Sequence, residues 1–407
     1  MSPINAAVLG AGSRGVNYSE YSLVAPEELK IVAVAEPRED RRAAFAQRFS
    51  VPADSCFSSW EELLSKPKLA DVVFVCTLDE EHTAPALLAL EKGYHVLLEK
   101  PMSNKEEECI AIEAAARKAG KVLSVCHVLR YTAFYRTLKA LIDRGAVGEL
   151  TNITHIENVA YWHQAHSFVR GNWRRSDETS PMILQKCCHD MDILLWLSGK
   201  DCRRVHSFGS LRHFTPENAP EGAPARCLDG CPHKDTCLYY APKLYLTGKT
   251  DWPVDVLTTD LTEEGITKAL REGPYGRCVY HCDNDVVDRQ VVSLEMEDGV
   301  ICTQTMTAFS QKCHRQLKIQ GTLGQIEADM ATNEIRLETF GAGVETVPVD
   351  TSDTSGHGGG DFGLLRDFLE TLRSGGEAFT SARKSLQSHL ICFAAERSRQ
   401  EGRVIEL

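Results

Sequence analysis

The 407-residue sequence predicts an α/β protein with a doubly wound parallel sheet in its N-terminal part and a large, mostly antiparallel open sheet in a second α/β domain. Short, uniformly apolar segments alternate with helical patterns in the first part, as is typical of buried parallel strands joined by crossover helices. Farther along, apolar segments follow one another through short turns without helices between them, which indicates antiparallel pairing. The two patterns predict one domain at residues 1–127 and another at residues 128–407.

The elements of the first domain follow from apolar runs and helical periodicity. Five strands are predicted, at Ile4–Leu9, Ile31–Ala35, Val72–Cys76, His95–Leu98 and Val122–Cys126. Helices are predicted between them, at Arg38–Phe49, Pro85–Lys92 and Lys105–Ala119, with Gly120 as the stop signal.

The second domain is expected to begin with a helix, and sheet dominates its later part. A helix at Ala133–Arg144, a strand at Leu150–Asn158 and a helix from about Cys188 come first. Six strands are then predicted, at Val286–Met296, Val300–Phe309, Arg315–Gln320, Gly324–Ala328, Asn333–Thr339 and Gly343–Val349. Two helices, Phe362–Ser374 and Ala382–Gln400, follow the glycine-rich run Ser355–Gly360.

The composition excludes several classes of protein. Lys and Arg total 45 against 57 Asp and Glu, a net charge of -12, so nucleic acid is not an expected partner. No apolar run approaches the roughly 18 residues that span a bilayer, so no membrane partner is expected, and a strand from Ile4 leaves no room for a signal peptide. The 15 cysteines are an odd number, mostly scattered singly among apolar residues, which favours a reducing, cytoplasmic location.

The first chemical motif is a candidate phosphate cradle, Gly10-Ala-Gly12-Ser-Arg-Gly15, between the first strand and a helix. Its glycines let the backbone turn tightly and approach a pyrophosphate at the helix N-terminus. Glu36, at the end of the second strand, can bind the ribose hydroxyls of the adenosine half, which favours NAD. Arg38 beside it could accept a phosphate, so NADP is the less favoured alternative. The alternative to both is a glycine-rich turn with no ligand.

A second motif, Glu99-Lys100-Pro101, ends the fourth strand. Ligands bind at the carboxyl ends of parallel strands, where a lysine can contact a ribose or a substrate hydroxyl. The alternative is a solvated lysine before a turn proline.

Several motifs together resemble the Gfo/Idh/MocA oxidoreductases. The matching features are Gly10-x-Gly12-x-x-Gly15, Thr77–His82, Glu99-Lys100-Pro101, Arg144-Gly145-x-x-Gly148-Glu149-Leu150 and His189-x-x-Asp192. The resemblance implies an N-terminal Rossmann domain, a C-terminal α/β domain with an open sheet, a nicotinamide cofactor at their junction, and homodimers or homotetramers packed through the sheet.

The resemblance also assigns roles to residues. Lys100 is expected beside the nicotinamide ribose and the substrate, with a cis bond to Pro101, and His189 is expected to be the acid/base residue. The expected cofactor contacts are Gly10, Gly12, Ser13, Arg14, Gly15, Glu36, Arg38, Thr77, His82, Glu99 and Lys100. Without the resemblance, a single histidine before a helix is more typical of a cap or a core residue.

The sequence departs from the family pattern four residues before His189. Many members have an aspartate there, whereas position 185 is Gln, followed by Lys186-Cys187-Cys188. Lys186, as a third catalytic candidate, or Asp190 beside the histidine is expected to take over part of the aspartate's task. A nearby ammonium stabilises a developing alkoxide and, if it is desolvated, can itself serve as a base.

The segment 155–175 is rich in aromatic, imidazole and guanidinium groups, a mixture that suits a polyol. The expected substrate wall comprises Tyr161, Trp162, His163, His166, Arg170, Asn172, Trp173 and Arg174, with Lys186 and Asp190. His127, Arg130 and Tyr131 are expected to close the other side. The local positive charge is consistent with an anionic carbohydrate and equally with a solvated loop.

A cysteine-rich insert is expected at about residues 215–285. Such a segment, with little apolar content, needs a staple, and zinc held by thiolates supplies one. The expected ligands are Cys227, Cys231, Cys237 and Cys282, with Cys278 or His281 as alternates, and His233 is a further imidazole candidate. An iron–sulfur cluster and unrelated buried thiols are the alternatives.

A late glycine-rich run, Gly356-His357-Gly-Gly-Gly360-Asp361, precedes a predicted helix. Its flexibility would let His357 reach the active site, whereas the simpler interpretation is a linker with Asp361 as the helix N-cap.

These features predict an NAD-dependent oxidoreductase that transfers hydride between the nicotinamide and a secondary hydroxyl or keto group of a sugar, sugar acid or glycoside. One alternative is an NAD-dependent glycoside hydrolase that oxidises its substrate transiently, commonly at sugar carbon 3, eliminates the aglycone and then reverses the oxidation. A second alternative is a non-catalytic regulator that senses NAD.

Overall fold

The first sheet of the computed structural model, which describes residues 2–407, has six parallel strands in the order β3-β2-β1-β4-β5-β6. Its strands are β1 (Ile4–Leu9), β2 (Leu29–Ala35), β3 (Cys56–Phe57), β4 (Val72–Val75), β5 (His95–Leu98) and β6 (Leu123–Val125). Its helices are α1 (Ser13–Ser19), α2 (Tyr21–Val24), α3 (Glu39–Phe49), α4 (Trp60–Ser65), α5 (Thr83–Glu91) and α6 (Glu106–Ala119). This strand order confirms the predicted doubly wound sheet. The sequence prediction omitted β3, whose two residues are too few to show a pattern.

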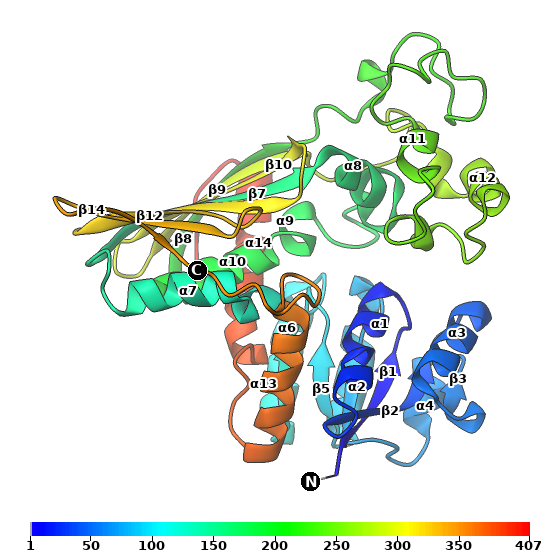
Figure 1. The fold of residues 1–407 in the computed structure, drawn as a ribbon, viewed down its shortest axis with the longest axis horizontal. Coiled ribbons are helices and arrows are strands. Elements are labelled where there is room, and N and C mark those ends of the chain that lie inside the picture. Colours follow the sequence, from blue (N-terminus) through cyan, green and yellow to red (C-terminus); the bar gives the residue numbers. More distant parts are fainter. Residues whose placement is uncertain (1) are drawn as a thin grey trace.

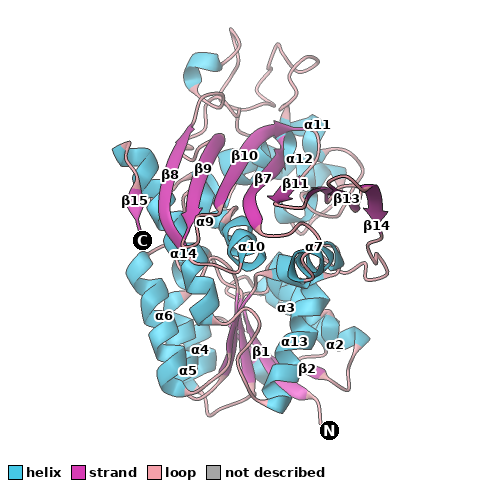
Figure 2. Ribbon diagram, turned by 90° about the vertical axis from the view of Figure 1, so that its left-hand side faces the viewer, coloured by secondary structure: helices cyan, strands magenta, loops and turns pink. Residues whose placement is uncertain are grey.

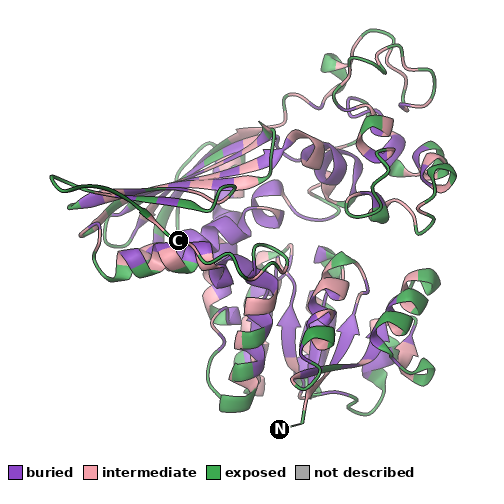
Figure 3. Ribbon diagram, in the orientation of Figure 1, coloured by how far each residue is buried: buried purple, intermediate pink, exposed green. Residues whose placement is uncertain are grey.

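The second sheet has nine strands in the order β14-β13-β12-β11-β7-β10-β9-β8-β15. They are β7 (Leu150–Ala160), β8 (Cys202–Ser210), β9 (Arg289–Met296), β10 (Ile301–Ser310), β11 (His314–Gly321), β12 (Gly324–Asp329), β13 (Glu334–Thr339), β14 (Gly343–Val347) and β15 (Ile405–Glu406). Only β7 and β10 pair in parallel, so the prediction of a mostly antiparallel open sheet is confirmed. Burial alternates along its strands, because one face packs on helices and the other is partly exposed (Figure 3).

Helices α10 and α14 cover the inner face of this sheet (Figure 2). The helices of the second part are α7 (Ala133–Asp143), α8 (Tyr161–His163), α9 (Met182–Gln185), α10 (Cys188–Ser198), α11 (Ala241–Tyr245), α12 (Glu263–Glu272), α13 (Gly360–Ser374) and α14 (Ala382–Glu401). Helix α14 also contacts α6 and β6, so it joins the two sheets into one molecule. None of the helices in residues 2–407 combines the length and apolarity needed to cross a bilayer.

Helix α13 belongs to the core of the first sheet, although it follows the second sheet in sequence. Leu364, Leu365 and Phe368 are fully buried and pack in the same cluster as Val8 and Phe74 of the parallel strands. Figure 1 shows α13 beside that sheet, with the insert that carries α11 and α12 projecting from the end of the second sheet. The late part of the chain therefore completes the first core, and the division of the chain at residues 127 and 128 stays a prediction.

Truncating the aromatic ring that ties α13 to the parallel sheet tests this packing. Phe368→Ala is expected to lower the free energy of unfolding by about 3–5 kcal/mol, because the side chain is fully buried and leaves a cavity. Phe340→Ala, at a 57% exposed position in a turn, serves as the control and is expected to change stability by less than about 0.5 kcal/mol. Urea unfolding of both variants measures the difference, and equal stabilities would contradict the packing role of Phe368.

Candidate active site

The glycine-rich turn is shaped for a close ligand. Gly10 has a φ of +91°, and a Cβ there would overlap the carbonyl oxygen of Cys76. A Cβ at Gly15 would overlap the carbonyl oxygen of Gly10. Beside Gly12, by contrast, nothing lies within 4 Å, so its backbone is open to an approaching group. Two glycines are therefore needed to build the turn and the third leaves room for a pyrophosphate.

Glu36 is buried at the end of β2 with its carboxylate against this turn. Its Oε2 accepts from the Ala11 amide at 2.9 Å, and its Oε1 accepts from the Arg38 amide at 3.0 Å. An ionised carboxylate has about four acceptor sites, so both oxygens keep capacity for ribose hydroxyls. Arg38 is paired with Asp40 at 2.7 Å, and this hydrogen bond lowers the pKa of Asp40 to about 2. The guanidinium that could accept a 2′-phosphate thus already holds a charged carboxylate.

Thr77 and His82, which both follow β4, differ in their availability to a ligand. The Thr77 hydroxyl is buried and has no hydrogen-bond partner within residues 2–407, as expected of a group that contacts a ligand. The ring of His82 is buried, with Nδ1 2.7 Å from the Pro101 carbonyl oxygen and Nε2 3.2 Å from that of Thr77. His82 therefore holds the two loops together and has little surface to offer a cofactor.

Arg14 is the centre of an ion-pair network at the same edge of the sheet. Its Nε donates to Glu99 Oε1 at 2.9 Å, and its two terminal nitrogens donate to Asp361 at 3.0 and 2.8 Å. The Tyr18 hydroxyl also donates to Glu99 Oε1, at 2.6 Å. Burial raises the pKa of Glu99, but Arg14, Lys100 and Tyr18 together hold it below its usual range. Arg14, Glu99 and the late helix α13 are thereby fixed to one another, a link that spacing did not predict.

Lys100 reaches from β5 into the second part of the chain. The Lys100–Pro101 bond is cis, as the family resemblance implied. The ammonium nitrogen donates to the carbonyl oxygen of Gln185 at 2.8 Å, which places it beside the start of α10 and His189. The backbone carbonyl of position 185 thus orients the lysine.

His189 lies in a group of imidazoles. Its ring is 5.5 Å from that of His127 and 6.2 Å from that of His357, between ring centroids. Burial lowers the pKa of His189 well below its ordinary value, and the charges of Lys100, His127 and Arg315 add to this. His189 is therefore neutral at physiological pH, as a general base must be. Its Nδ1 is buried and has no hydrogen-bond partner in the described chain.

Lys186 and Asp190, which were expected to take over the task of the missing aspartate, form ion pairs with charged residues of the second sheet. The Lys186 ammonium lies 3.3 Å from Glu157 Oε1 and stays partly exposed. Asp190 is fully buried and accepts from Arg315 Nε at 2.6 Å, so its carboxylate is already engaged within the protein. Sequence reasoning missed Glu157 and Arg315, although charges at inward-facing strand positions of β7 and β11 were a usable signal.

Three residues that follow β6 and were expected to face the substrate belong to the core. Arg130 forms a buried bidentate pair with Asp192, at 2.6 and 2.7 Å. The Tyr131 hydroxyl donates to Asp367 at 3.1 Å, toward α13. His127 is fully buried between the rings of His189 and His389. The first two hold helices together, and only His127 adjoins the predicted base.

The basic side chains of the expected substrate wall also bind within the protein. Arg170 is fully buried and donates to the carbonyl oxygens of Arg277 and Tyr239, so it anchors the insert. Arg174 makes two hydrogen bonds to Asp283, at 2.8 and 3.0 Å. Their charges are compensated or structural, and the segment gives no support to an anionic substrate.

Aromatic groups from the segment and the insert form a continuous cluster next to Lys186. Trp162 stacks on His163 and lies 5.4 Å from Trp252, and His166 stacks on Tyr275 at 4.7 Å. Burial lowers the pKa of His163 well below its ordinary value, and the charges of Lys186 and Lys100 add to this. Of the remaining wall residues, Tyr161 is half-buried, Asn172 is exposed, and Trp173 donates to Asp79. Trp252 and Tyr275 were missed, because an aromatic residue in a distant insert gives no sign of where it packs.

The zinc prediction finds no support in the described residues. Within residues 2–407, no group of three or more His, Cys, Asp or Glu side chains is arranged to hold a metal. Cys227, Cys231, Cys237 and Cys278 line one small hollow with His233, but their sulfurs serve other contacts or none. Cys227 Sγ accepts from Arg170 and from the Ala241 amide. The proposed ligand Cys282 donates to the carbonyl oxygen of Cys278. The alternate ligand His281 donates to the carbonyl oxygen of Ala223. An apolar cluster stabilises this part of the insert: Phe214, Tyr239 and Tyr280 pack there with Cys237, Cys278 and Cys282.

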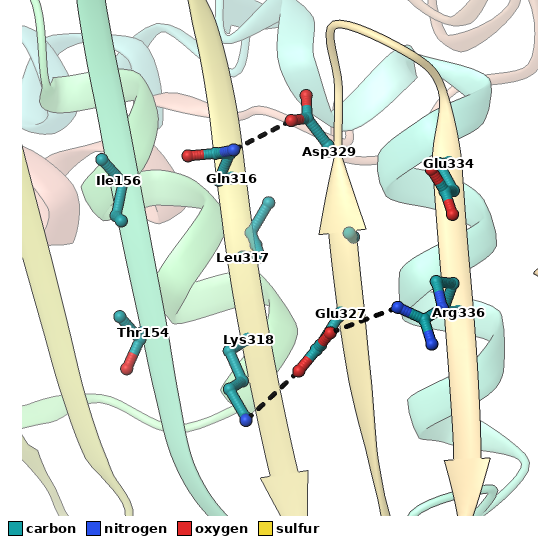
Figure 4. Close-up of a pocket in the computed structure, with 10 residues that line it drawn as sticks. Thr154, Ile156, Gln316, Leu317, Lys318, Glu327, Asp329, Glu334 and Arg336 are labelled. Atoms are coloured by element: carbon teal, nitrogen blue, oxygen red, sulfur yellow. Dashed lines mark hydrogen bonds and ion pairs between the residues drawn. The ribbon is translucent and has the colours of Figure 1, made fainter. Parts of the chain in front are cut away.

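A hollow of about 330 Å³ lies on the second sheet, apart from this site. Figure 4 shows its side chains paired with one another: Lys318 and Arg336 both contact Glu327, and Gln316 donates to Asp329. Its polar groups are thus engaged among themselves and do not converge on a reacting atom.

Comparison with protein families matches both parts of the chain. Residues 4–127 match an oxidoreductase family described by an NAD-binding Rossmann fold, and residues 139–407 match the C-terminal alpha/beta domain of the same family. The chain belongs to the Gfo/Idh/MocA oxidoreductase family. Relatives of the chain include YteT of Bacillus subtilis (strain 168), which is named as an oxidoreductase and is 27% identical over 75% of this chain and 73% of that protein.

Two further relatives differ in the reaction their names describe. The D-glucoside 3-dehydrogenase of Escherichia coli (strain K12) is 30% identical over 37% of this chain and 42% of its own. The 2,7-anhydro-N-acetylneuraminate hydratase of the same organism is 26% identical over 52% of this chain and 55% of its own. Among solved structures, a levoglucosan dehydrogenase complex with NADH and levoglucosan has a TM-score of 0.76 at 18% identity, covering 100% of this chain and 99% of that one. The Gfo/Idh/MocA fold is thus shared along the whole chain.

The buried imidazoles of this family member predict a loss of stability in mild acid. Burial lowers the pKa of His155, His166 and His389 to about 3 each. The unfolded chain protonates these rings below about pH 6.5 whereas the folded chain does not, so each costs about 1.4 kcal/mol of stability per pH unit below that point. The urea midpoint is expected to fall steeply between about pH 6.5 and pH 5, before most carboxylates titrate. A midpoint that stays constant over this interval would contradict the neutral, buried state of the rings.

Proposed function

We propose that the protein is an NAD-dependent oxidoreductase that transfers hydride between the nicotinamide and a secondary hydroxyl or keto group of a sugar or sugar derivative. The observation that carries the proposal is the meeting of Lys100 and a neutral His189 at the carboxyl end of the parallel sheet. The glycine turn and Glu36 lie at the same edge of the sheet, where doubly wound sheets bind dinucleotides. The sugar class is supported by the D-glucoside dehydrogenase among the relatives.

The two central residues have complementary roles in this proposal. Oxidation of a secondary alcohol requires removal of the hydroxyl proton, and the neutral imidazole of His189 accepts it. The Lys100 ammonium, oriented by the Gln185 carbonyl, stabilises the developing alkoxide. Bound NAD would supply the hydride acceptor. Thr77, with its unpaired hydroxyl, and the open face of Gly12 would contact the cofactor, while Arg14 and Glu99 shape the site from behind.

The aromatic cluster supports a carbohydrate substrate. Tyr161, Trp162 and Trp252 present partly exposed rings, and aromatic faces pack on the C–H surfaces of sugars. Because Arg170 and Arg174 are engaged within the protein, we infer a neutral sugar or glycoside rather than a sugar acid.

NAD is favoured over NADP by the same local charges. Glu36 retains acceptor capacity for the ribose hydroxyls, whereas the Arg38 fork is held by Asp40. A 2′-phosphate would meet the carboxylates of Glu36 and Asp40, and the Arg38 guanidinium beside them is already paired.

A second candidate function is favoured by the hydratase among the relatives. In this alternative, a glycoside would be oxidised transiently with bound NAD as the hydride acceptor. The proton next to the new ketone and the aglycone would then be eliminated, water would add to the resulting double bond, and the oxidation would be reversed. The same two residues would serve, because each redox half-step moves one proton at His189.

Two further features of the proposed enzyme concern its state in the cell. We infer a reducing, cytoplasmic location, since all 15 cysteines are free thiols. We also infer a homo-oligomer that uses the outer face of the second sheet, where Phe208, Val291 and Phe309 are exposed.

A single assay separates the candidate functions. Protein is incubated with NAD and a panel of free sugars, sugar acids and aryl glycosides, and reduced nicotinamide and released aglycone are followed together. Accumulation of reduced nicotinamide in step with product is expected. Aglycone release over many turnovers without net reduction of NAD would establish the hydrolase. Neither reduced nicotinamide nor aglycone, from a protein that binds NAD, would indicate a sensor.

Substitution of the base is expected to remove the chemistry and leave the cofactor bound. His189→Ala should lower kcat by about a hundredfold or more, because general base catalysis is worth that much. The dissociation constant of NAD, measured by fluorescence quenching, should change little. His206→Ala, on the second sheet away from the site, is the matched control. An unchanged kcat in His189→Ala would exclude the residue from the reaction.

Substitution of the ribose carboxylate tests the choice of cofactor. Glu36→Ala is expected to weaken NAD binding by about tenfold, since two hydrogen bonds to the ribose are lost, and to weaken NADP less. Titration of both cofactors against wild type and variant measures the ratio. An equal loss for both would show that Glu36 only supports the glycine turn through the Ala11 amide.

A further inference from the structure

His357 is held beside His189 by a strained and well-anchored loop. It has a φ of +57°, an uncommon conformation for a residue with a side chain, and lies before α13. Its Nδ1 is 3.0 Å from Asp361 Oδ1, and Asp361 is itself fixed by Arg14. The sequence left open whether this loop reaches the active site, and the structure places its imidazole there.

The two imidazoles differ in their access to solvent. His189 is 6% exposed, whereas the side chain of His357 is 39% exposed, with 6.2 Å between the ring centroids. A proton accepted by His189 has to leave it before the next turnover. Lys100, His127 and Arg315 disfavour its retention, because each lowers the pKa of His189. The base thus needs a route for its proton, and His357 is an imidazole at the right place to provide it.

We propose that His357, oriented by Asp361, is a proton relay between His189 and solvent. The proposal rests on the oxidoreductase function stated above. His357 acts through His189 and is therefore a positioning and relay residue. It supplies from a late loop the carboxylate–imidazole pair that position 185 does not provide.

The charges around His357 suit a group that holds a proton only briefly. Partial desolvation lowers the pKa of His357, Asp361 opposes this by favouring the imidazolium, and Arg14 and Arg315 lower the pKa again. Asp361 is 2% exposed and keeps its charge, because Arg14 and His357 hold its pKa far below the usual range despite burial. His357 thus returns to the neutral state and can accept the next proton.

Protons and electrons balance over one oxidation of the sugar. The sugar O–H bond breaks and its proton passes to His189, while the C–H electron pair leaves as hydride to oxidised NAD and the carbon–oxygen bond becomes double. His189 then gives the proton to His357, directly or through one water, and His357 releases it to solvent. Both imidazoles are neutral again at the end, and reduction of the ketone runs the same transfers in reverse.

The experiment compares His357→Gln and His357→Ala with wild type. Glutamine keeps a donor for Asp361 but cannot carry the proton, so a role in transfer and a role in holding the loop give different results. Both variants should lower kcat by about tenfold or more with NAD affinity unchanged, since proton transfer by a positioned side chain is worth at least this much. Added imidazole should restore part of kcat in His357→Ala, increasingly as pH rises and imidazole becomes neutral. His206→Gln is the control and should match wild type.

Several outcomes would overturn the relay. These are a kcat equal to wild type in both variants, a full rescue by glutamine without imidazole, or a loss of NAD affinity that accounts for the whole loss of activity. Wild type tested in parallel separates the two proposals: if wild type transfers no hydride, the oxidoreductase function fails and the relay with it, whereas active wild type and equally active variants overturn the relay alone.

Discussion

The ion pairs of Arg14 with Asp361 and Glu99 are the constraint on which the site depends. Arg14 lies within the glycine motif at the start of α1, Glu99 directly follows β5 and Asp361 lies in the first turn of α13, so one guanidinium joins three distant segments. The two carboxylates are 7% and 2% exposed, and loss of the arginine would leave both charges buried without compensation, a cost of about 3–5 kcal/mol. Lys100 follows Glu99 directly and His357 is hydrogen-bonded to Asp361, so both chemical groups take their positions from this network.

A second constraint is the excess of positive groups around His189. Lys100, His127 and Arg315 all disfavour a charged imidazole, and the nearest carboxylates serve other partners. Asp192 is bound to Arg130 and Asp190 to Arg315. A family member with an aspartate at position 185 would stabilise the imidazolium, and this chain does not. The consequence is a base that stays neutral but holds a proton poorly, which is why the neighbouring His357 matters.

The sequence predicted the parts of the fold and site that are encoded locally. Uniform apolar runs identified β1 and β5 without error, and the glycine turn, Lys100 and His189 were found because each lies in a short motif at a strand or helix end. Contacts between distant segments were missed. Nothing local shows that Asp361 meets Arg14, or that Trp252 packs on Trp162, because strand register and loop path decide these contacts.

Charge in the sequence was also a poor guide to exposure. Arg130 and Arg170 were assigned to the substrate wall as polar groups, yet each is buried and bonded within the protein. Their partners, Asp192 and the carbonyl oxygen of Tyr239, lie 62 and 69 residues farther along the chain, beyond the reach of periodicity. The zinc site expected in the insert finds no support in the described residues for the same reason, since cysteine spacing does not show whether the sulfurs converge.

The central claim is that His189 and Lys100 promote hydride transfer from a secondary sugar carbon. Deuterium transfer tests this directly, because deuterium passes from the sugar carbon to the nicotinamide only if hydride is transferred, and reactions stopped during turnover retain the label in the reduced nicotinamide. Wild-type protein is incubated with NAD and sugars deuterated at each carbinol carbon, and the nicotinamide is recovered after release from the protein and analysed by mass spectrometry. The account predicts deuterium in the nicotinamide from one carbon of at least one sugar, and its loss in His189→Ala. NAD recovered without label from every sugar, by a protein that binds both cofactor and sugar, would contradict it.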